Sequence, residues 1–129
     1  MKRILTVSAA AFIGFAAPAY AEGDAAKGEA VFKKCMACHA VGEGAKNKVG
    51  PQLNGVVGSV IGKHAPDYKY SKALTELGEQ GKVWDDANMT EWLRNPKAFG
   101  PGTKMAFAGL KKDDEIADVI AFLKTHPAM

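Results

Sequence analysis

Cys35-Met36-Ala37-Cys38-His39 holds both cysteines of the 129-residue chain and one of its three histidines. Two thiols three residues apart, followed at once by an imidazole, form the pattern of covalent c-type haem attachment. The spacing suits that chemistry because the two thiols add across the two vinyl groups of one haem, while the adjacent imidazole reaches the iron. The pattern therefore predicts attachment of one haem c through Cys35 and Cys38, with His39 as the proximal iron ligand.

The first 21 residues have the composition of a secretory signal. Lys2 and Arg3 give a positive start, an apolar run covers 4–17, and Ala19-Tyr20-Ala21 has small residues at the positions that a signal peptidase recognises. An uncleaved membrane anchor is the alternative, although the run is shorter than the about 20 residues that a span needs. We expect cleavage after Ala21, export to the periplasm, and a single mature domain, 22–129.

Net charge argues against a nucleic-acid-binding protein. The chain has 17 basic and 14 acidic side chains, and the expected signal removes two basic ones, Lys2 and Arg3. The mature domain is then close to neutral, whereas nucleic-acid binders are strongly basic.

Two other kinds of site use closely spaced cysteines. A redox-active dithiol normally lies in a βαβ pattern, and this sequence contains no such pattern. A structural zinc site needs four ligands and usually a second close pair of them, which the chain lacks. Both alternatives are less consistent with the sequence than haem attachment.

The remaining pattern predicts an all-α domain with long loops. Helices are expected over 24–34, 71–79, from 85 or 86 to just before Pro96, over 96–99, and from a capping Asp113 to an end near Lys124 and His126. Between them, the Gly- and Pro-rich segments 40–70 and 100–107 form no regular element. A long irregular loop is unusual in a compact domain, so we expect its apolar residues to be buried against the haem: Val49, Leu53, Val56 and Val57.

A second axial ligand must come from elsewhere in the chain. The candidates are Met36, His64, Met89, Met105, His126 and Met129. Met36 is inside the attachment motif, Met89 begins an amphipathic helix, and His126 and Met129 belong to the C-terminus. His64 is expected to be a solvated loop residue. Met105 is favoured because Pro101 restrains its loop, with a methionine that only fills a gap as the alternative.

Three segments together resemble class I c-type cytochromes, the family of bacterial cytochrome c2 and mitochondrial cytochrome c. They are the helix and motif at 29–39, Gly50-Pro51-Gln52-Leu53-Asn54-Gly55, and 95–107, which runs from Asn95-Pro96-Lys97 to Pro101-Gly102-Thr103-Lys104-Met105-Ala106-Phe107. The resemblance covers essentially the whole mature chain. It implies the small cytochrome c fold, in which the N- and C-terminal helices cross and short helices and long loops enclose one covalent haem.

The resemblance also implies roles for individual residues. Met105 would be the distal iron ligand, and the Pro51 carbonyl would hold the His39 ring. Tyr70 and Trp84 match the residues that hydrogen-bond a haem propionate, Tyr68 matches the tyrosine beside them, and Thr103 matches a hydroxyl near the other propionate. Gly28 would lie where the terminal helices cross, beneath Phe122.

Three residues depart from the family pattern. Ser59 stands where an arginine usually lies near the inner propionate, Leu74 replaces an asparagine of mitochondrial members, and Trp92 stands where a tyrosine often approaches the methionine sulfur. None is an iron ligand, so the departures affect the expected propionate network and the fine setting of the reduction potential.

The expected function is a soluble one-electron carrier, not an enzyme, because histidine and methionine together leave iron no open position. The resemblance suggests a membrane cytochrome bc complex as donor and a terminal oxidase or a photosynthetic reaction centre as acceptor. Peripheral membrane contact and a monomer are expected. The alternative is a cytochrome subunit, or dedicated donor, of a periplasmic dehydrogenase or peroxidase.

Lysines close to the predicted haem crevice suggest steering towards acidic partners. They are Lys33, Lys34, Lys48, Lys97, Lys104, Lys111 and Lys112, whereas Glu76, Glu79, Asp85, Asp86 and Glu91 cluster in the middle of the chain. Lysines are common on protein surfaces in general, so the sequence alone leaves both interpretations open.

Overall fold

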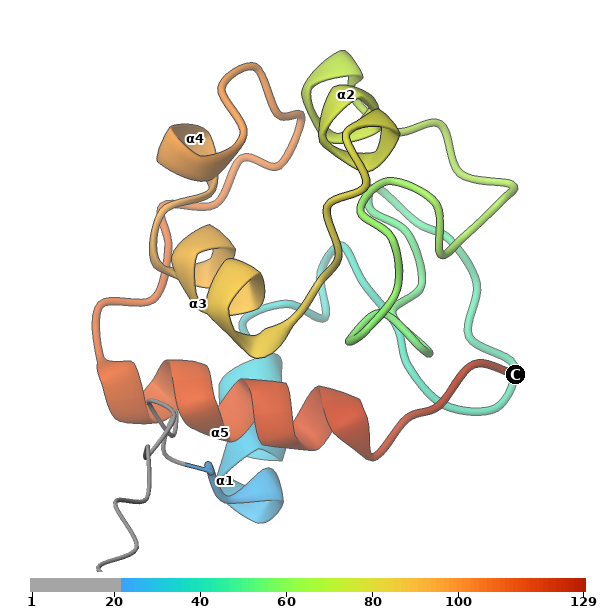
Figure 1. The fold of residues 1–129 in the computed structure, drawn as a ribbon. Helices are drawn as coiled ribbons and strands as arrows, with labels where there is room; N and C mark the ends of the chain where they lie inside the picture. Colours follow the sequence, from blue (N-terminus) through green and yellow to red (C-terminus); the bar gives the residue numbers. More distant parts are fainter. Residues whose placement is uncertain (1–21) are drawn as a thin grey trace, which may run out of the picture.

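Five helices and the loops between them form residues 22–129, the part of the chain that the computed structural model describes (Figure 1). The expected signal segment, 1–21, lies outside it. The helices are α1 (Ala25–Phe32), α2 (Lys72–Glu79), α3 (Asp86–Arg94), α4 (Pro96–Phe99) and α5 (Asp113–Lys124). The prediction of an all-α domain is confirmed. Within 22–129 the single β pairing is an isolated bridge between Val60 and Val83. None of the described helices is long and apolar enough to cross a membrane.

Side-chain caps set where most of these helices begin. Asp24 accepts hydrogen bonds from the first turn of α1, Ser71 does so for α2, and Asp85 does so for α3. Each cap satisfies a backbone N–H that has no partner within its helix. Asn95 ends α3 and caps α4. The first residue of α4 is Pro96, which has no N–H, and an N–H at that position would have had no acceptor within the helix.

The expectation that Asp113 caps the last helix is wrong. The N-cap residue of α5 is Lys112, which makes no side-chain capping bond, and Asp113 is the first helical residue. The carboxylate of Asp113 instead accepts a hydrogen bond from Arg94 Nη2 at 2.7 Å. Helix α5 begins without a cap bond, but its first turn carries three acidic side chains that suit the positive end of the helix dipole.

Helices α1 and α5 cross and pack closely against each other (Figure 1). The crossing is possible because residue 28 is a glycine. A Cβ atom at Gly28 would overlap the carbonyl oxygen of Asp118 and lie 2.8 Å from Phe122 Cβ. The rings of Phe32 and Phe122 pack beside the crossing at a centroid distance of 5.2 Å. Gly28 therefore has the packing role that the sequence suggested.

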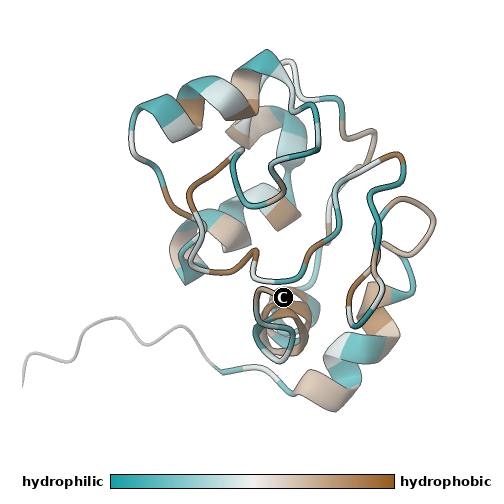
Figure 2. Ribbon diagram, turned by 90° about the vertical axis from the view of Figure 1, so that its right-hand side faces the viewer, coloured by the Kyte–Doolittle hydropathy of each residue, from teal (hydrophilic) through white to brown (hydrophobic). Residues whose placement is uncertain are grey.

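The loops contribute to the core as much as the helices do. Figure 2 shows α5 nearly end-on, with apolar positions in brown along the loops as well as in the helices. Ile61, in the loop before α2, is fully buried, and so are Ile116 and Val119 of α5. Trp84, Trp92 and Phe99 form an aromatic cluster with centroid distances of 5.4 to 6.1 Å.

Candidate haem site

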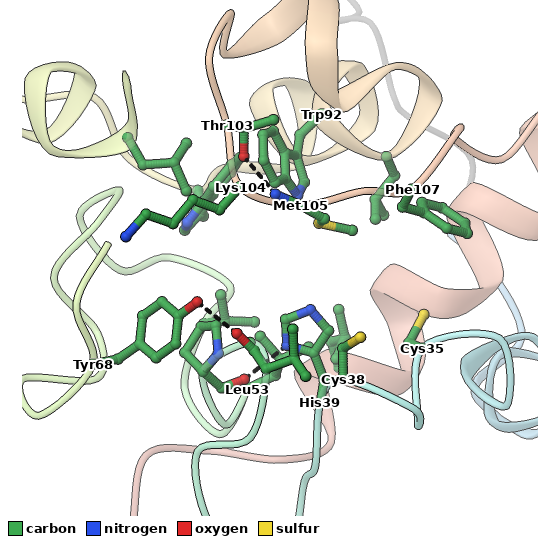
Figure 3. A pocket seen from close by; sticks show the side chains of 18 of the residues that line it. Cys35, Cys38, His39, Leu53, Tyr68, Trp92, Thr103, Lys104, Met105 and Phe107 are labelled. Carbon is green, nitrogen blue, oxygen red and sulfur yellow. Dashed lines mark hydrogen bonds between the residues drawn. The ribbon is translucent and has the colours of Figure 1, made fainter. Parts of the chain in front are cut away.

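The attachment motif forms one tight turn directly after α1. The helix ends at Phe32, two residues earlier than predicted, and the next N–H groups bond three residues back rather than four. The N–H groups of Cys38 and His39 both donate to the Cys35 carbonyl, at 3.1 and 2.9 Å. Residues three or four apart in such a turn share one face. Both thiols and the imidazole are therefore presented to the same side, as Figure 3 shows.

A cavity of about 390 Å³ opens on that side of the motif. All nine residues that the sequence singled out line it: Cys35, Cys38, His39, Pro51, Tyr68, Tyr70, Trp84, Thr103 and Met105. Most of the rest of the lining is apolar, including Leu53, Val56 and Leu93. In Figure 3, Cys38, His39, Leu53 and Tyr68 lie on one wall, and Thr103, Lys104, Met105 and Phe107 lie on the opposite wall. The arrangement is a slot with an imidazole on one side and a thioether on the other.

The His39 ring is fixed by the backbone behind it. Its Nδ1 lies 2.7 Å from the Pro51 carbonyl oxygen, so Nδ1 carries the proton and Nε2 faces the slot as a lone-pair donor. Burial lowers the pKa of His39, and the Pro51 hydrogen bond opposes that shift. The neutral imidazole, which is the form that binds metals, is therefore favoured.

Met105 belongs to a loop that is restrained at several points. The Thr103 N–H donates to the Gly100 carbonyl at 2.9 Å, and the Met105 N–H donates to Thr103 Oγ1 at 3.2 Å. These bonds hold the half-buried Met105 side chain toward the slot (Figure 3). Among the other methionines, Met89 is in the core and also lines the cavity, while Met36 and Met129 are mostly exposed.

The polar end of the cavity contains a residue that the sequence analysis misplaced. His64, expected to be a solvated loop residue, is half-buried and lines the cavity. Its Nε2 lies 2.6 Å from the Gln52 carbonyl oxygen, and its Nδ1 lies 3.1 Å from Tyr70 Oη. Burial lowers the pKa of His64, with the Gln52 hydrogen bond opposing that shift. The Gly- and Pro-rich composition of this loop predicts an exposed histidine. Only Tyr68 and Tyr70, which follow it, indicate that the segment is packed against the domain.

Among the apolar loop residues that were expected to face the haem, Leu53 and Val56 line the cavity as predicted. Val49 also lines it but is 74% exposed, at the rim rather than inside. Val57 does not line the cavity and packs against the core elsewhere. Val56 and Val57 are adjacent in an irregular loop, where alternation does not determine which of the two points inward.

The geometry does not suit the two other uses of the cysteines. Burial raises the pKa of the Cys35 thiol, whereas a redox-active cysteine needs a lowered pKa. In residues 22–129, no three His, Cys, Asp or Glu side chains come together as a metal-binding group. The half-buried, unpaired thiols of Cys35 and Cys38 lie at the edge of an apolar slot instead.

Comparison with known proteins identifies the family. The sequence pattern of the cytochrome c family matches residues 25–127. The chain belongs to the cytochrome c family. It is 55% identical to cytochrome c2 of Agrobacterium tumefaciens (strain II Chrys) over 102 residues, which are 79% of this chain and 91% of that protein. It is also 50% identical over 126 residues to cytochrome c2 of Rhodomicrobium vannielii, with 98% of each chain covered.

Solved structures agree with the sequence comparison. Cytochrome c2 from Rhodospirillum centenum superposes with a TM-score of 0.76 at 44% identity, over 81% of this chain and 99% of that one. Cytochrome cH from Methylobacterium extorquens gives a TM-score of 0.72 at 47% identity, over 80% and 99% of the two chains. The fold is therefore the cytochrome c fold.

Membership of this family means that the chain binds one covalent haem c and takes part in electron transport. The residues present fit that group. The slot is flat and mostly apolar, the two thiols of the attachment motif are free, and a neutral imidazole lies beside them. Hydroxyl and ring N–H groups at the polar end suit the carboxylates of the haem.

The three departures from the family pattern occupy different places. Ser59 does not line the cavity, and its hydroxyl donates to the Val56 carbonyl at 2.6 Å. The side chain that replaces the usual arginine is therefore committed to its own turn. Leu74 and Trp92 both line the cavity, and Trp92 lies on the same wall as Met105 (Figure 3).

Proposed function

We propose that this cytochrome is a soluble, periplasmic one-electron carrier whose haem iron has His39 and Met105 as its two axial ligands. The observation that carries the proposal is that these side chains lie on opposite walls of the slot. The Pro51 carbonyl holds the His39 ring, and the Thr103 hydroxyl holds the Met105 backbone. The cysteines at the edge, Cys35 and Cys38, would fix the haem in that slot through two thioether bonds.

This ligand pair favours electron transfer over catalysis at the iron. When bound, haem c supplies a one-electron couple, and a methionine ligand places its potential higher than two nitrogen ligands would. The Pro51 carbonyl holds the His39 ring in the orientation that binding requires, and the Thr103 hydroxyl does the same for the Met105 backbone. Because both axial positions would be filled by protein side chains, we infer that the protein is not an enzyme.

The rest of the site would exclude water and bind the haem carboxylates. The aromatic cluster contributes two buried side chains to the wall of the slot, Trp84 and Trp92, with the partly buried Phe99 packed against them, and it keeps the dielectric constant low. The proposed propionate-binding residues are Tyr70 and Trp84, with Tyr68 beside them and Thr103 near the other propionate. A rigid, dry site of this kind changes little between oxidation states, which favours fast transfer.

We further propose that the protein accepts electrons from a membrane cytochrome bc complex and delivers them to a terminal oxidase or a photosynthetic reaction centre. As a monomer it would touch these membrane complexes only peripherally. Lys34 and Lys104 line the cavity, so positive charge lies close to the proposed haem. Such charge speeds encounter with acidic partners at low salt.

The test is electron transfer with isolated membranes. Membranes that contain a quinol-oxidising bc complex should reduce the oxidised protein, and membranes that contain an oxidase or a reaction centre should reoxidise it in turn. The Met105→Ala variant, with an open axial position, should exchange electrons more slowly and should bind carbon monoxide when reduced. If the unaltered reduced protein bound carbon monoxide readily, the closed-site carrier would be refuted.

A further inference from the structure

The backbone segment behind His39 has every one of its carbonyls occupied. The carbonyls of 49–52, called here the carbonyl segment, accept four hydrogen bonds. Tyr68 Oη donates to Val49 O at 2.8 Å, and the Lys48 N–H donates to Gly50 O at 2.8 Å. His39 Nδ1 lies 2.7 Å from Pro51 O, and His64 Nε2 lies 2.6 Å from Gln52 O. One of these carbonyls thus binds the proposed iron ligand, and carbonyls on both sides of it bind side chains of the 64–70 loop.

The N–H groups of the carbonyl segment and of the next residue bond to the attachment motif and to Ala40, which follows the motif. The Gly50 N–H donates to Cys38 O at 2.9 Å, and the Leu53 N–H donates to Ala40 O at 2.9 Å. The Gln52 N–H is bound separately by Asn47 Oδ1 at 2.9 Å. The Pro51 carbonyl is therefore fixed from two directions, by the motif that carries His39 and by the loop that carries Tyr68 and His64.

We propose that His64 and Tyr68 are positioning residues for the proximal iron ligand. They act through the Gln52 and Val49 carbonyls and hold the Pro51 carbonyl at hydrogen-bonding distance from His39. The inference rests on the proposed role of His39 as an iron ligand, and it gives His64 a function that neither its loop nor its residue type suggested.

The Gln52 carbonyl determines which nitrogen of the His64 ring carries the proton. The Gln52 carbonyl can only accept, so His64 Nε2 carries the ring proton and Nδ1 is an acceptor. Tyr70 Oη accepts from the Ala65 N–H at 2.9 Å and lies 3.1 Å from His64 Nδ1, so its one proton can be given to His64 or to a haem propionate. Tyr70 in turn packs edge-to-face on Tyr68 at a centroid distance of 5.0 Å. The two positioning residues belong to one connected unit.

Loosening this unit should weaken the hydrogen bond between His39 and Pro51. That bond gives the imidazole more negative character and makes it a stronger donor to the oxidised metal. A weaker bond therefore destabilises the ferric state, and the midpoint potential should rise. The Nδ1 proton of His39 should also exchange faster with solvent, because the carbonyl that protects it is less well held.

The experiment uses the haem-loaded protein and two pairs of variants. His64→Leu removes the Gln52 bond, whereas His64→Gln keeps an N–H donor close to the position of Nε2. Tyr68→Phe removes only the hydroxyl that binds Val49. The matched control is Thr125→Val, which removes a 2.6 Å side-chain bond to the Phe122 carbonyl and none of the bonds to the carbonyl segment. For each protein we would measure the midpoint potential and, by NMR of the reduced form, the exchange rate of the His39 Nδ1 proton.

We expect His64→Leu and Tyr68→Phe to raise the potential and to speed His39 proton exchange about fivefold, the factor that corresponds to one hydrogen bond. His64→Gln should restore most of both values, and Thr125→Val should change neither. Equal effects of His64→Leu and His64→Gln, or none in His64→Leu and Tyr68→Phe, would overturn the proposal. If His64→Leu does not fold, the potential and the proton exchange rate of Tyr68→Phe decide whether the proposal holds. Failure of the proposed function would be distinguishable from failure of this inference, because the unaltered protein itself would then lack the NMR signals of an iron-bound His39.

Discussion

Replacing Gly50 with alanine should disturb His39, the proposed proximal ligand, directly. Gly50 is buried, and a Cβ atom there would overlap Cε1 of His39 and lie 2.8 Å from Nδ1 and 2.9 Å from Nε2. These contacts cover the face of the imidazole, so the ring has to move away from the backbone. The φ angle of Gly50 is not positive, and the effect is therefore steric rather than one of backbone strain.

The size of the effect follows from two contributions. Overfilling a well-packed site costs about 1–3 kcal/mol. The hydrogen bond of 2.7 Å between His39 Nδ1 and Pro51 O is stretched as the ring recedes, and its loss costs a further ~1 kcal/mol. We therefore expect Gly50→Ala to destabilise the haem-loaded protein by roughly 2–4 kcal/mol. The midpoint potential should rise because the imidazole becomes a weaker donor.

The assay is chemical unfolding followed by the haem absorption, with the midpoint potential measured on the same samples. Gly100→Ala is the matched control, because Gly100 is also buried and its Cβ would meet Trp92 at an ordinary 3.4 Å. The control should lose well under half as much stability and keep its potential. If Gly50→Ala had the stability and potential of the unaltered protein, the placement of the His39 ring against Gly50 would be refuted.

Three further predictions concern the helix crossing, pH and docking. Gly28→Ala should lower the free energy of unfolding by about 2 kcal/mol in denaturant titrations, because overlap with the Asp118 carbonyl and with Phe122 outweighs the gain in helix propensity. Because burial lowers the pKa of His64, the folded state binds fewer protons there than the unfolded state, so unfolding free energy should fall as pH drops below about 6.5. His64→Gln should flatten that dependence. Changing Lys33 and Lys104 to glutamate should slow low-salt association with a redox partner several-fold, and an unchanged rate would refute steering.

The haem-attachment motif could be recognised in the sequence because its chemistry dictates spacing. Two vinyl groups and one iron require the pattern at Cys35, Cys38 and His39 wherever the rest of the chain goes. Helix starts were similarly local, since Asp24 and Ser71 bond to N–H groups two or three residues ahead. Features of this kind depend on a few residues that are close in the sequence, and they can therefore be predicted from it.

The features that were misjudged depend on partners distant in the chain. Asp113 can cap a helix, but Arg94, 19 residues away, takes its carboxylate. His64 is buried because its acceptors are a backbone carbonyl at Gln52 and a side chain at Tyr70. A backbone acceptor leaves no signature in the residue types, so no sequence pattern could have revealed that contact.

The most direct test of the central claim is the absorption spectrum of the oxidised protein. A methionine sulfur bound to ferric haem iron gives a weak band in the far red. We predict that the unaltered protein has this band and that Met105→Ala lacks it, while Met89→Leu, which alters another cavity-lining methionine, retains it. Absence of the band from the unaltered protein, or its persistence in Met105→Ala, would contradict ligation by Met105 and with it the closed-site carrier.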